Sequence, residues 1–196
     1  MFGDSIVWGA GDPEGGGWVT RLRNWCENNL EDVEVYNLGI SADSTNELLR
    51  RFISESEARH PDVIVFAIGI NDSQYIDSRE HPRITPEIFE RNLEELIRQA
   101  GQFTRQIIFV GLTRVDELKT SPIPWRENTF YENEFVEQYD HAIKSVAEEH
   151  KLLYIDVSKN LAPDDLADGL HPNSDGHKKL FEIMLRSLKQ YVFQAT

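Results

Sequence analysis

Residues 62–69 read Asp-Val-Ile-Val-Phe-Ala-Ile-Gly, a continuous apolar run that begins with an acidic residue and ends with a glycine. A strand that is buried on both faces of a sheet has this pattern, because neither of its faces needs polar residues. Residues 69–72, Gly-Ile-Asn-Asp, follow the run at once. Burial on both faces is typical of parallel strands with helices above and below, so the run predicts an α/β sheet.

Similar apolar runs recur along the chain and alternate with segments of helical periodicity. The predicted strands are a first strand cut to Met1 and Phe2, followed by residues 33–38, 62–69, 106–111 and 152–157. The predicted helices are residues 18–29, 44–60, 85–101, 130–150 and 173–193. This alternation predicts a parallel sheet of five strands with helices on both faces. No linker or repeat interrupts the pattern, so we expect residues 1–196 to form a single domain.

Polar residues and glycines follow four of the predicted strands. Ser5 follows the first, Gly39 the second, Asn71 the third, and a loop with Asp168 and His171 follows the last. The carboxyl ends of parallel strands lie at the same edge of a sheet, and ligands bind there. We therefore expect these five residues to gather at one edge.

The chemistry of these residue types suits acyl transfer. A serine hydroxyl becomes a nucleophile when a histidine takes its proton and a carboxylate orients that histidine. The chain offers Ser5, His171 and Asp168 for these roles. The Asn71 amide and the backbone N–H of Gly39 are suitable donors to a developing oxyanion. Taken singly, each residue is also an ordinary turn or cap residue, so the hypothesis rests on their occurring together.

Composition excludes several other classes of function. The 196 residues include 40% hydrophobic residues and carry a formal net charge of -14. Such a charge repels phosphate backbones and anionic lipids, so we expect no nucleic-acid and no membrane partner. The single cysteine, Cys26, lies in a predicted helix and permits no intrachain disulfide. The sequence shows no signal peptide, and we expect a cytoplasmic protein.

The quoted segments resemble the conserved blocks of the SGNH hydrolases, which are also called GDSL esterases and lipases. Residues 3–5 (Gly-Asp-Ser) match the first block, Gly39 the second, residues 69–72 the third and residues 168–171 (Asp-Gly-Leu-His) the fifth. The resemblance implies a flavodoxin-like three-layer α/β/α sandwich with strand order 2-1-3-4-5. In this chain its first strand is truncated.

The same resemblance implies a mechanism. Ser5 attacks an ester carbonyl after His171 takes its proton, and Asp168 orients the imidazole. The backbone N–H groups of Ser5 and Gly39 and the side chain of Asn71 bind the oxyanion. No metal or organic cofactor is implied. The expected substrate is a small molecule, most simply a short-chain acyl or acetyl ester. Thioesterase or lysophospholipase activity, or a catalytically silent binding domain of the same fold, are the alternatives.

Two further features concern the surroundings of the site. Residues 9–17, 73–84 and 113–128 are the predicted loops around it, and they include or adjoin four aromatic residues, Trp8, Tyr75, Trp125 and Phe130. Each of these rings is a candidate contact for an acyl or aryl group, or equally a packing residue. A metal site built from Asp168, His171, Asp175 and His177 is disfavoured, because no His-x-x-x-His or cysteine pair supports it. We expect His177 to pack near the start of the last helix.

Overall fold

The computed structural model describes residues 1–193. Five parallel strands form the main sheet, in the order β2-β1-β3-β5-β7. Their bounds are β1 Phe2–Gly3, β2 Leu38–Gly39, β3 Val63–Ala67, β5 Gln106–Val110 and β7 Leu153–Ile155. Counted along the chain, this is the order 2-1-3-4-5, so the predicted topology is confirmed.

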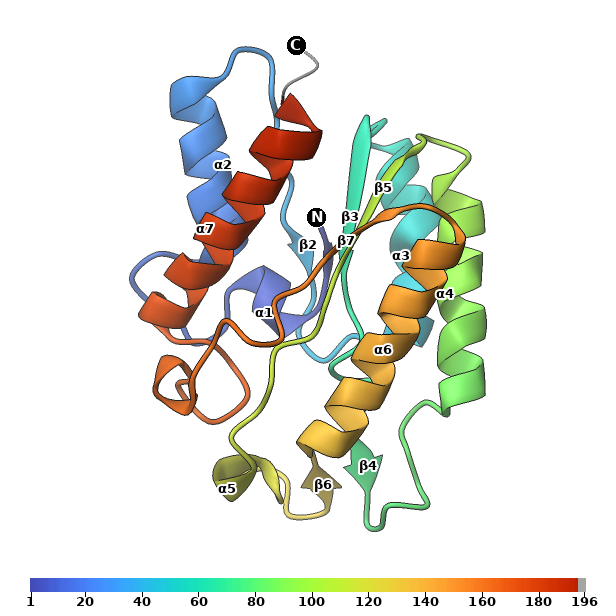
Figure 1. The fold of residues 1–196 in the computed structure, drawn as a ribbon, viewed down its shortest axis with the longest axis vertical. Coiled ribbons are helices and arrows are strands. Elements are labelled where there is room, and N and C mark those ends of the chain that lie inside the picture. The colour runs from blue at the N-terminus through green and yellow to red at the C-terminus, as the bar shows by residue number, and fades with distance from the viewer. Residues whose placement is uncertain (194–196) are drawn as a thin grey trace.

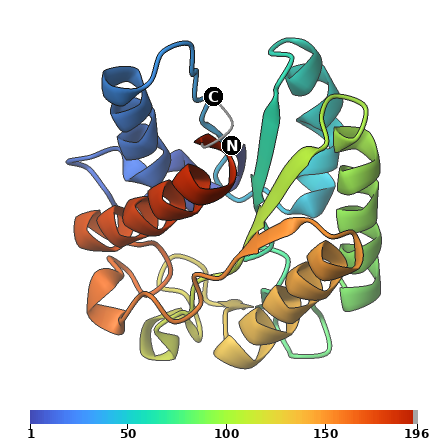
Figure 2. The same cartoon turned by 45° about the horizontal axis from the view of Figure 1, so that its top comes forward.

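Helices cover both faces of this sheet and complete a three-layer sandwich (Figures 1 and 2). One face carries α2 Gly17–Asn29 and α7 Ser174–Tyr191. The other carries α3 Thr45–Glu57, α4 Pro86–Ala100 and α6 Asn133–Glu149. Buried Cys26 lies in α2, as the sequence predicts.

The central strand β3 divides its side chains between the two helical layers. Ile64 and Phe66 belong to the apolar cluster beneath α3, α4 and α6, whereas Val65 belongs to the cluster beneath α2 and α7. Alternate side chains of a strand point to opposite faces, and here both faces are buried. The continuous apolar run is therefore explained by burial on both sides.

Local signals set the helix starts. The Ser44 hydroxyl caps α3 and Glu47 returns to the Ser44 backbone, so the predicted capping box is present. Thr85 caps α4 ahead of Pro86, and Asn173 caps α7 by accepting from the N–H groups of Asp175 and Gly176. Because Asn173 is a cap, the last helix begins one residue later than predicted.

A predicted strand and a predicted helix begin several residues later than expected. The strand predicted at residues 33–38 is regular only at Leu38–Gly39, because β1 offers only Phe2 and Gly3 as partners. The helix predicted from Phe130 begins at Asn133, because Thr129–Phe130 forms β6 and pairs with β4, Tyr75–Ile76. This two-stranded sheet and three one-turn helices were not predicted; the helices are α1 Ser5–Trp8, α5 Glu117–Thr120 and η1 Pro163–Asp165.

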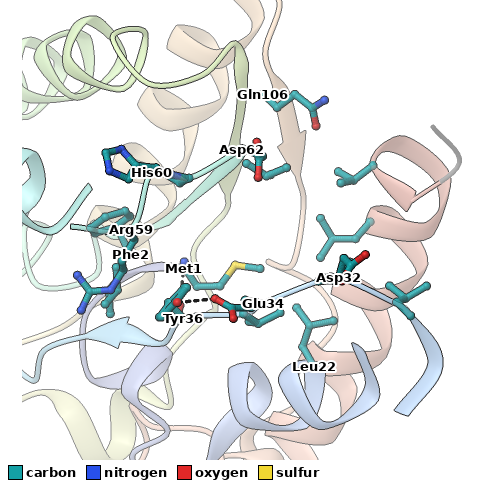
Figure 3. Close-up of a pocket in the computed structure, with 18 of the residues that line it drawn as sticks. Met1, Phe2, Leu22, Asp32, Glu34, Tyr36, Arg59, His60, Asp62 and Gln106 are labelled. Carbon is teal, nitrogen blue, oxygen red and sulfur yellow. Dashed lines mark hydrogen bonds between the residues drawn. The ribbon is translucent and has the colours of Figure 1, made fainter. Parts of the chain in front are cut away.

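A cavity of about 700 Å³ lies beside the amino end of β1 (Figure 3). Its lining includes Val33 and Val35 from the segment before β2, Val63 of β3 and Leu188 of α7. β3 pairs with β5 from Val63 onward, but with β1 only at Phe66 and Ala67. The cavity thus continues the line of β1 between the segment before β2 and the first half of β3.

The Met1 ammonium group stands at the edge of this cavity. Its nitrogen donates to the carbonyl of Tyr36 over 3.1 Å. Burial, together with the charge of Arg59, lowers the pKa of this amino group to about 5. A backbone amide at the same place would keep the hydrogen bond without the cost of burying a charge.

We predict that four apolar residues added before Met1 stabilise the protein. Counting back from the Phe2 pairs with Leu38 and Phe66, they would run opposite residues 33–36 and 61–64. Burial of their side chains exceeds the cost of ordering them, so the thermal midpoint should rise by roughly 5–10 °C. Calorimetry measures this shift. A Gly-Ser-Gly-Ser extension is the matched control, and equal midpoints for the two extensions would contradict this account of the cavity.

Candidate active site

Ser5 lies at the carboxyl edge of the sheet, immediately after β1. It is the first residue of α1, and Asp4 caps this helix by accepting from the N–H of Ile6 over 2.9 Å. Ser5 is only 6% exposed. β1 is flanked by β2 and β3, so along this edge the serine lies between the ends of the strands that lead to Gly39 and Asn71.

His171 and Asp168 reach Ser5 from the loop before α7. Ser5 Oγ lies 2.9 Å from His171 Nε2, and His171 Nδ1 lies 2.7 Å from Asp168 Oδ2. A carboxylate accepts hydrogen bonds, so the proton of the neutral ring belongs on Nδ1, and Nε2 is left to accept from the serine hydroxyl. The structure therefore brings the three residues into one hydrogen-bonded series.

The loop that carries this pair is organised by the carboxylate itself. Asp168 Oδ1 accepts from the backbone N–H groups of His171 and Leu170, over 2.8 and 3.0 Å. Gly169 has a φ of 92°, and a Cβ there would lie 2.7 Å from Lys119 Cβ, so the turn requires glycine. Burial acts to raise the pKa of Asp168, but hydrogen bonds from His171 and Leu170 outweigh it and hold that pKa at about 2. Asp168 is thus ionised beside the imidazole.

Asn71 follows β3 and is 4% exposed. Its Nδ2 donates to the carbonyl of Asp43 over 3.0 Å, and its Oδ1 accepts from the hydroxyl of Tyr131 over 2.8 Å. An amide nitrogen carries two hydrogens, so one N–H of Asn71 has no recorded acceptor within residues 1–193. The predicted oxyanion donor is therefore firmly oriented and has one hydrogen to offer.

Gly39 ends β2, and its surroundings differ from those expected of a free donor. Its N–H donates to Asn37 Oδ1 over 3.0 Å. A Cβ on Gly39 would lie 2.2 Å from the backbone nitrogen of Trp8, so close packing against α1 requires glycine here. Three residues later, Ala42 has a φ of 67°, and its N–H has no recorded acceptor in the described part of the chain. Sequence reasoning missed Ala42, because alanine gives no signal of a left-handed backbone.

Comparison with known proteins identifies the family. The GDSL-like lipase/acylhydrolase family matches residues 1–179. The chain belongs to this family. It is 27% identical to an acetylxylan esterase of Geobacillus stearothermophilus over 167 residues, which cover 80% of this chain and 72% of that protein. The family and this relative make the chain an esterase or acylhydrolase.

Solved structures show the same fold. A lipase/acylhydrolase from Enterococcus faecalis superposes with a TM-score of 0.77 at 27% identity, covering 96% of this chain and 93% of that one. The acetylxylan esterase Axe2 of Geobacillus stearothermophilus gives a TM-score of 0.73 at 25% identity, covering 95% and 91%. The predicted resemblance to GDSL esterases and lipases is confirmed by these matches.

Two of the four candidate aromatic residues of this GDSL-family chain are exposed. Trp125 is 54% exposed, and its ring stacks on the imidazole of His171 at 5.9 Å between centroids. Trp8, in α1, is 59% exposed. Tyr75 and Phe130 instead stack on each other at 5.0 Å across β4 and β6. The tryptophans are therefore available to a ligand, whereas the other pair builds the small sheet.

No metal site or membrane span emerges from the described residues. Residues 1–193 contain no group of three or more histidine, cysteine, aspartate or glutamate side chains placed to hold a metal ion. His177 is buried in α7, where its Nε2 lies 2.8 Å from the carbonyl of Ala10, so its predicted packing role near the helix start is confirmed. Among the same residues, no helix is long and apolar enough to cross a bilayer.

Asp4, directly behind the serine, is the most perturbed acid near this site. It is buried, and burial raises the pKa of Asp4 to about 7, despite the hydrogen bond from Ile6 and the nearby His171. Asp72 is also buried, and burial raises its pKa to about 6, although Thr45 donates to it through both its N–H and its hydroxyl. Asp4 and Asp72 therefore both bind a proton more tightly in the folded protein than in the unfolded chain.

The free energy of unfolding of the parent should fall between acidic and neutral pH because Asp4 must ionise in the folded protein. We predict that Asp4→Asn removes the part of this fall that Asp4 causes. Between pH 3.8 and about 7, folded Asp4 keeps a proton that the unfolded chain releases. Stability therefore falls as pH rises through this window and levels off above it. Urea unfolding at about pH 4 and about pH 8 measures the difference between the parent and the variant. If the free-energy difference between the two proteins is the same at both pH values, the assigned shift is wrong.

Proposed function

We propose that this chain hydrolyses carboxylic esters through an acyl-enzyme formed on Ser5, and that short-chain acyl or acetyl esters are its substrates. The observation that carries this proposal is the series Ser5–His171–Asp168, with contacts of 2.9 and 2.7 Å. A binding-only domain has no need for such a series. We further propose that residues 1–196 act as one domain, since both apolar clusters pack on a single sheet.

The first half of the reaction forms the acyl-enzyme. His171 Nε2 takes the proton of Ser5 as Oγ attacks the carbonyl carbon, and Asp168 stabilises the imidazolium. The tetrahedral intermediate collapses when His171 gives that proton to the leaving alcohol. In the second half, His171 takes a proton from water as the water attacks the acyl group, and then gives that proton to Ser5 Oγ as the acid leaves. None of these steps calls for a cofactor.

The oxyanion needs fixed donors near Ser5. The free N–H of Asn71 is one, and the backbone N–H of Ser5, at the first position of α1, is another. The sequence predicts Gly39 as the third, but its N–H would first have to leave Asn37. We propose that the unpaired N–H of Ala42 supplies this donor, because the next residue, Asp43, already contacts Asn71 through its carbonyl.

Two observations support an acetyl or short acyl ester. The curated relative at 27% identity is an acetylxylan esterase. The exposed ring of Trp125 lies against His171, which must give its proton to the leaving alcohol. Such a ring offers a flat apolar surface to the alcohol part of a substrate, including a sugar ring.

We predict that Ser5→Ala abolishes hydrolysis of p-nitrophenyl acetate and butyrate, with a loss of at least about a thousandfold in kcat. A fluorophosphonate should label the parent and the exposed-helix control Ser145→Ala, but not Ser5→Ala. Hydrolysis that persists in Ser5→Ala would overturn the nucleophile. Labelling without hydrolysis of either ester would overturn the substrate class and direct the search to thioesters and lysophospholipids.

We predict that replacing the backbone N–H of Ala42 by oxygen slows hydrolysis, whereas the same change at Gly39 does not. Replacing Ala42 by lactic acid exchanges its N–H for an ester oxygen, and should lower kcat by about a hundredfold if this N–H binds the oxyanion. Replacing Gly39 by glycolic acid is the matched control and should change kcat little, since its N–H donates to Asn37. Semisynthesis supplies both proteins. The reverse ranking would assign the donor to Gly39.

A further inference from the structure

The side-chain amide of Asn71 is held at both of its polar atoms. Its nitrogen donates to the carbonyl of Asp43 and its oxygen accepts from the hydroxyl of Tyr131. Both contacts are buried, and Tyr131 is only 3% exposed. Residues 43, 71 and 131 come from three separate loops, so this arrangement is a property of the tertiary fold.

The Asp43 contact decides which way the amide faces. A backbone carbonyl only accepts hydrogen bonds, so the atom that meets it must be the nitrogen of Asn71. The oxygen then faces Tyr131, whose hydroxyl must donate. One amide hydrogen is used by Asp43, and the geometry of the planar amide fixes the direction of the other.

Both partners of Asn71 are themselves anchored. The carboxylate of Asp43 pairs with Arg51 over 2.7 Å, and Arg51 also donates to the carbonyl of Gly3 over 3.1 Å. Through Arg51, the segment around Asp43 is thereby tied to β1, the strand that precedes Ser5. A shift of the loop around Asp43 would therefore disturb Ser5 and Asn71 together.

Tyr131 is anchored through its backbone. Its N–H donates to the carbonyl of Thr120 over 3.0 Å, and its carbonyl accepts from the Thr120 hydroxyl over 2.9 Å. Burial, together with the charge of Asp4, raises the pKa of Tyr131, so its hydroxyl keeps its proton and stays a donor. Donation to the amide oxygen also polarises the amide and strengthens its remaining N–H as a donor.

We propose that Tyr131 is a positioning residue of the oxyanion site, which aims and polarises the free N–H of Asn71 toward the developing negative charge. This inference rests on the proposed role of Asn71 in ester hydrolysis. A donor that is fixed before the reaction costs no reorganisation when the oxyanion forms. Its effect therefore belongs to the transition state and not to substrate binding.

The test compares Tyr131→Phe, Asn71→Ala and the double variant in hydrolysis of p-nitrophenyl acetate. Removing the Tyr131 hydroxyl should lower kcat about tenfold and leave KM unchanged. In the Asn71→Ala background the same change should have no further effect on kcat, because nothing remains to be positioned. Tyr154→Phe is the matched control, since it removes another tyrosine hydroxyl, bonded to Asp140 over 2.8 Å, outside the proposed site.

The outcomes separate the two claims. A tenfold loss that persists undiminished in the Asn71→Ala background would overturn the positioning role of Tyr131 and leave the proposed function intact. A normal kcat in Tyr131→Phe alongside a large loss in Asn71→Ala would do the same. A normal kcat in Asn71→Ala would instead overturn the oxyanion role of Asn71, and this inference with it.

A second measurement needs no stable Tyr131 variant. The measurement is NMR of the parent protein. The signals of the two side-chain N–H protons of Asn71 are identified because they are absent from the spectrum of Asn71→Ala. Addition of a boronic acid, which mimics the tetrahedral intermediate, should shift one of these protons strongly. The other, which is bonded to Asp43, should keep its shift. Equal shifts of both protons, or of neither, would contradict the fixed orientation of the amide.

Discussion

The position of Ser5 depends on the close contact between Gly3 and the strand beside it. A Cβ on Gly3 would lie 2.2 Å from the carbonyl oxygen of Ala67 and 2.3 Å from a methyl of Val7, so only glycine allows β1, β3 and α1 to meet here. Phe2 anchors the same short strand, because its buried ring packs on Phe52 at 4.9 Å. Two residues therefore place the serine at the sheet edge between the ends of β2 and β3, and the loops that carry Asn71 and His171 approach it there.

Two aspartates near Ser5 have very different pKa values because their surroundings differ. Asp168 receives three hydrogen bonds from its own loop, which hold its pKa at about 2 despite burial. Asp4 receives one, from Ile6, and burial raises its pKa to about 7. Asp4 is almost completely buried, whereas the Asp168 side chain is 32% exposed, so the two carboxylates differ in burial as well as in hydrogen bonding. A charge is tolerated in the interior only where hydrogen bonds or water solvate it. A fixed anion therefore faces the imidazole, while the acid behind the serine titrates near neutral pH.

The sequence predicts the parts of the fold that depend on residues close together in the chain. The β3 run and the box at Ser44 depend on near neighbours alone, and both are present. The small sheet of β4 and β6 was not predicted, because each of its strands has two residues and pairs across more than 50 positions. That error also hid Tyr131, which lay inside a predicted helix and now stands between β6 and α6. The orientation of Asn71 and the left-handed Ala42 are set by tertiary contacts, for which single residue types carry no signal.

The short length of β1 also affects how easily the region around Ser5 opens locally. Asn71 follows β3, which pairs with β5 over four residues, whereas Ser5 follows a strand of two residues beside a cavity of about 700 Å³. Local opening requires less free energy where fewer backbone hydrogen bonds and apolar contacts must break. Displacement of Ser5 by about 1 Å is enough to separate it from His171 and impair catalysis. Ser5, the proposed nucleophile, thus belongs to a less stable part of the fold than Asn71, the proposed oxyanion donor, and activity should decline on heating before the sheet itself unfolds.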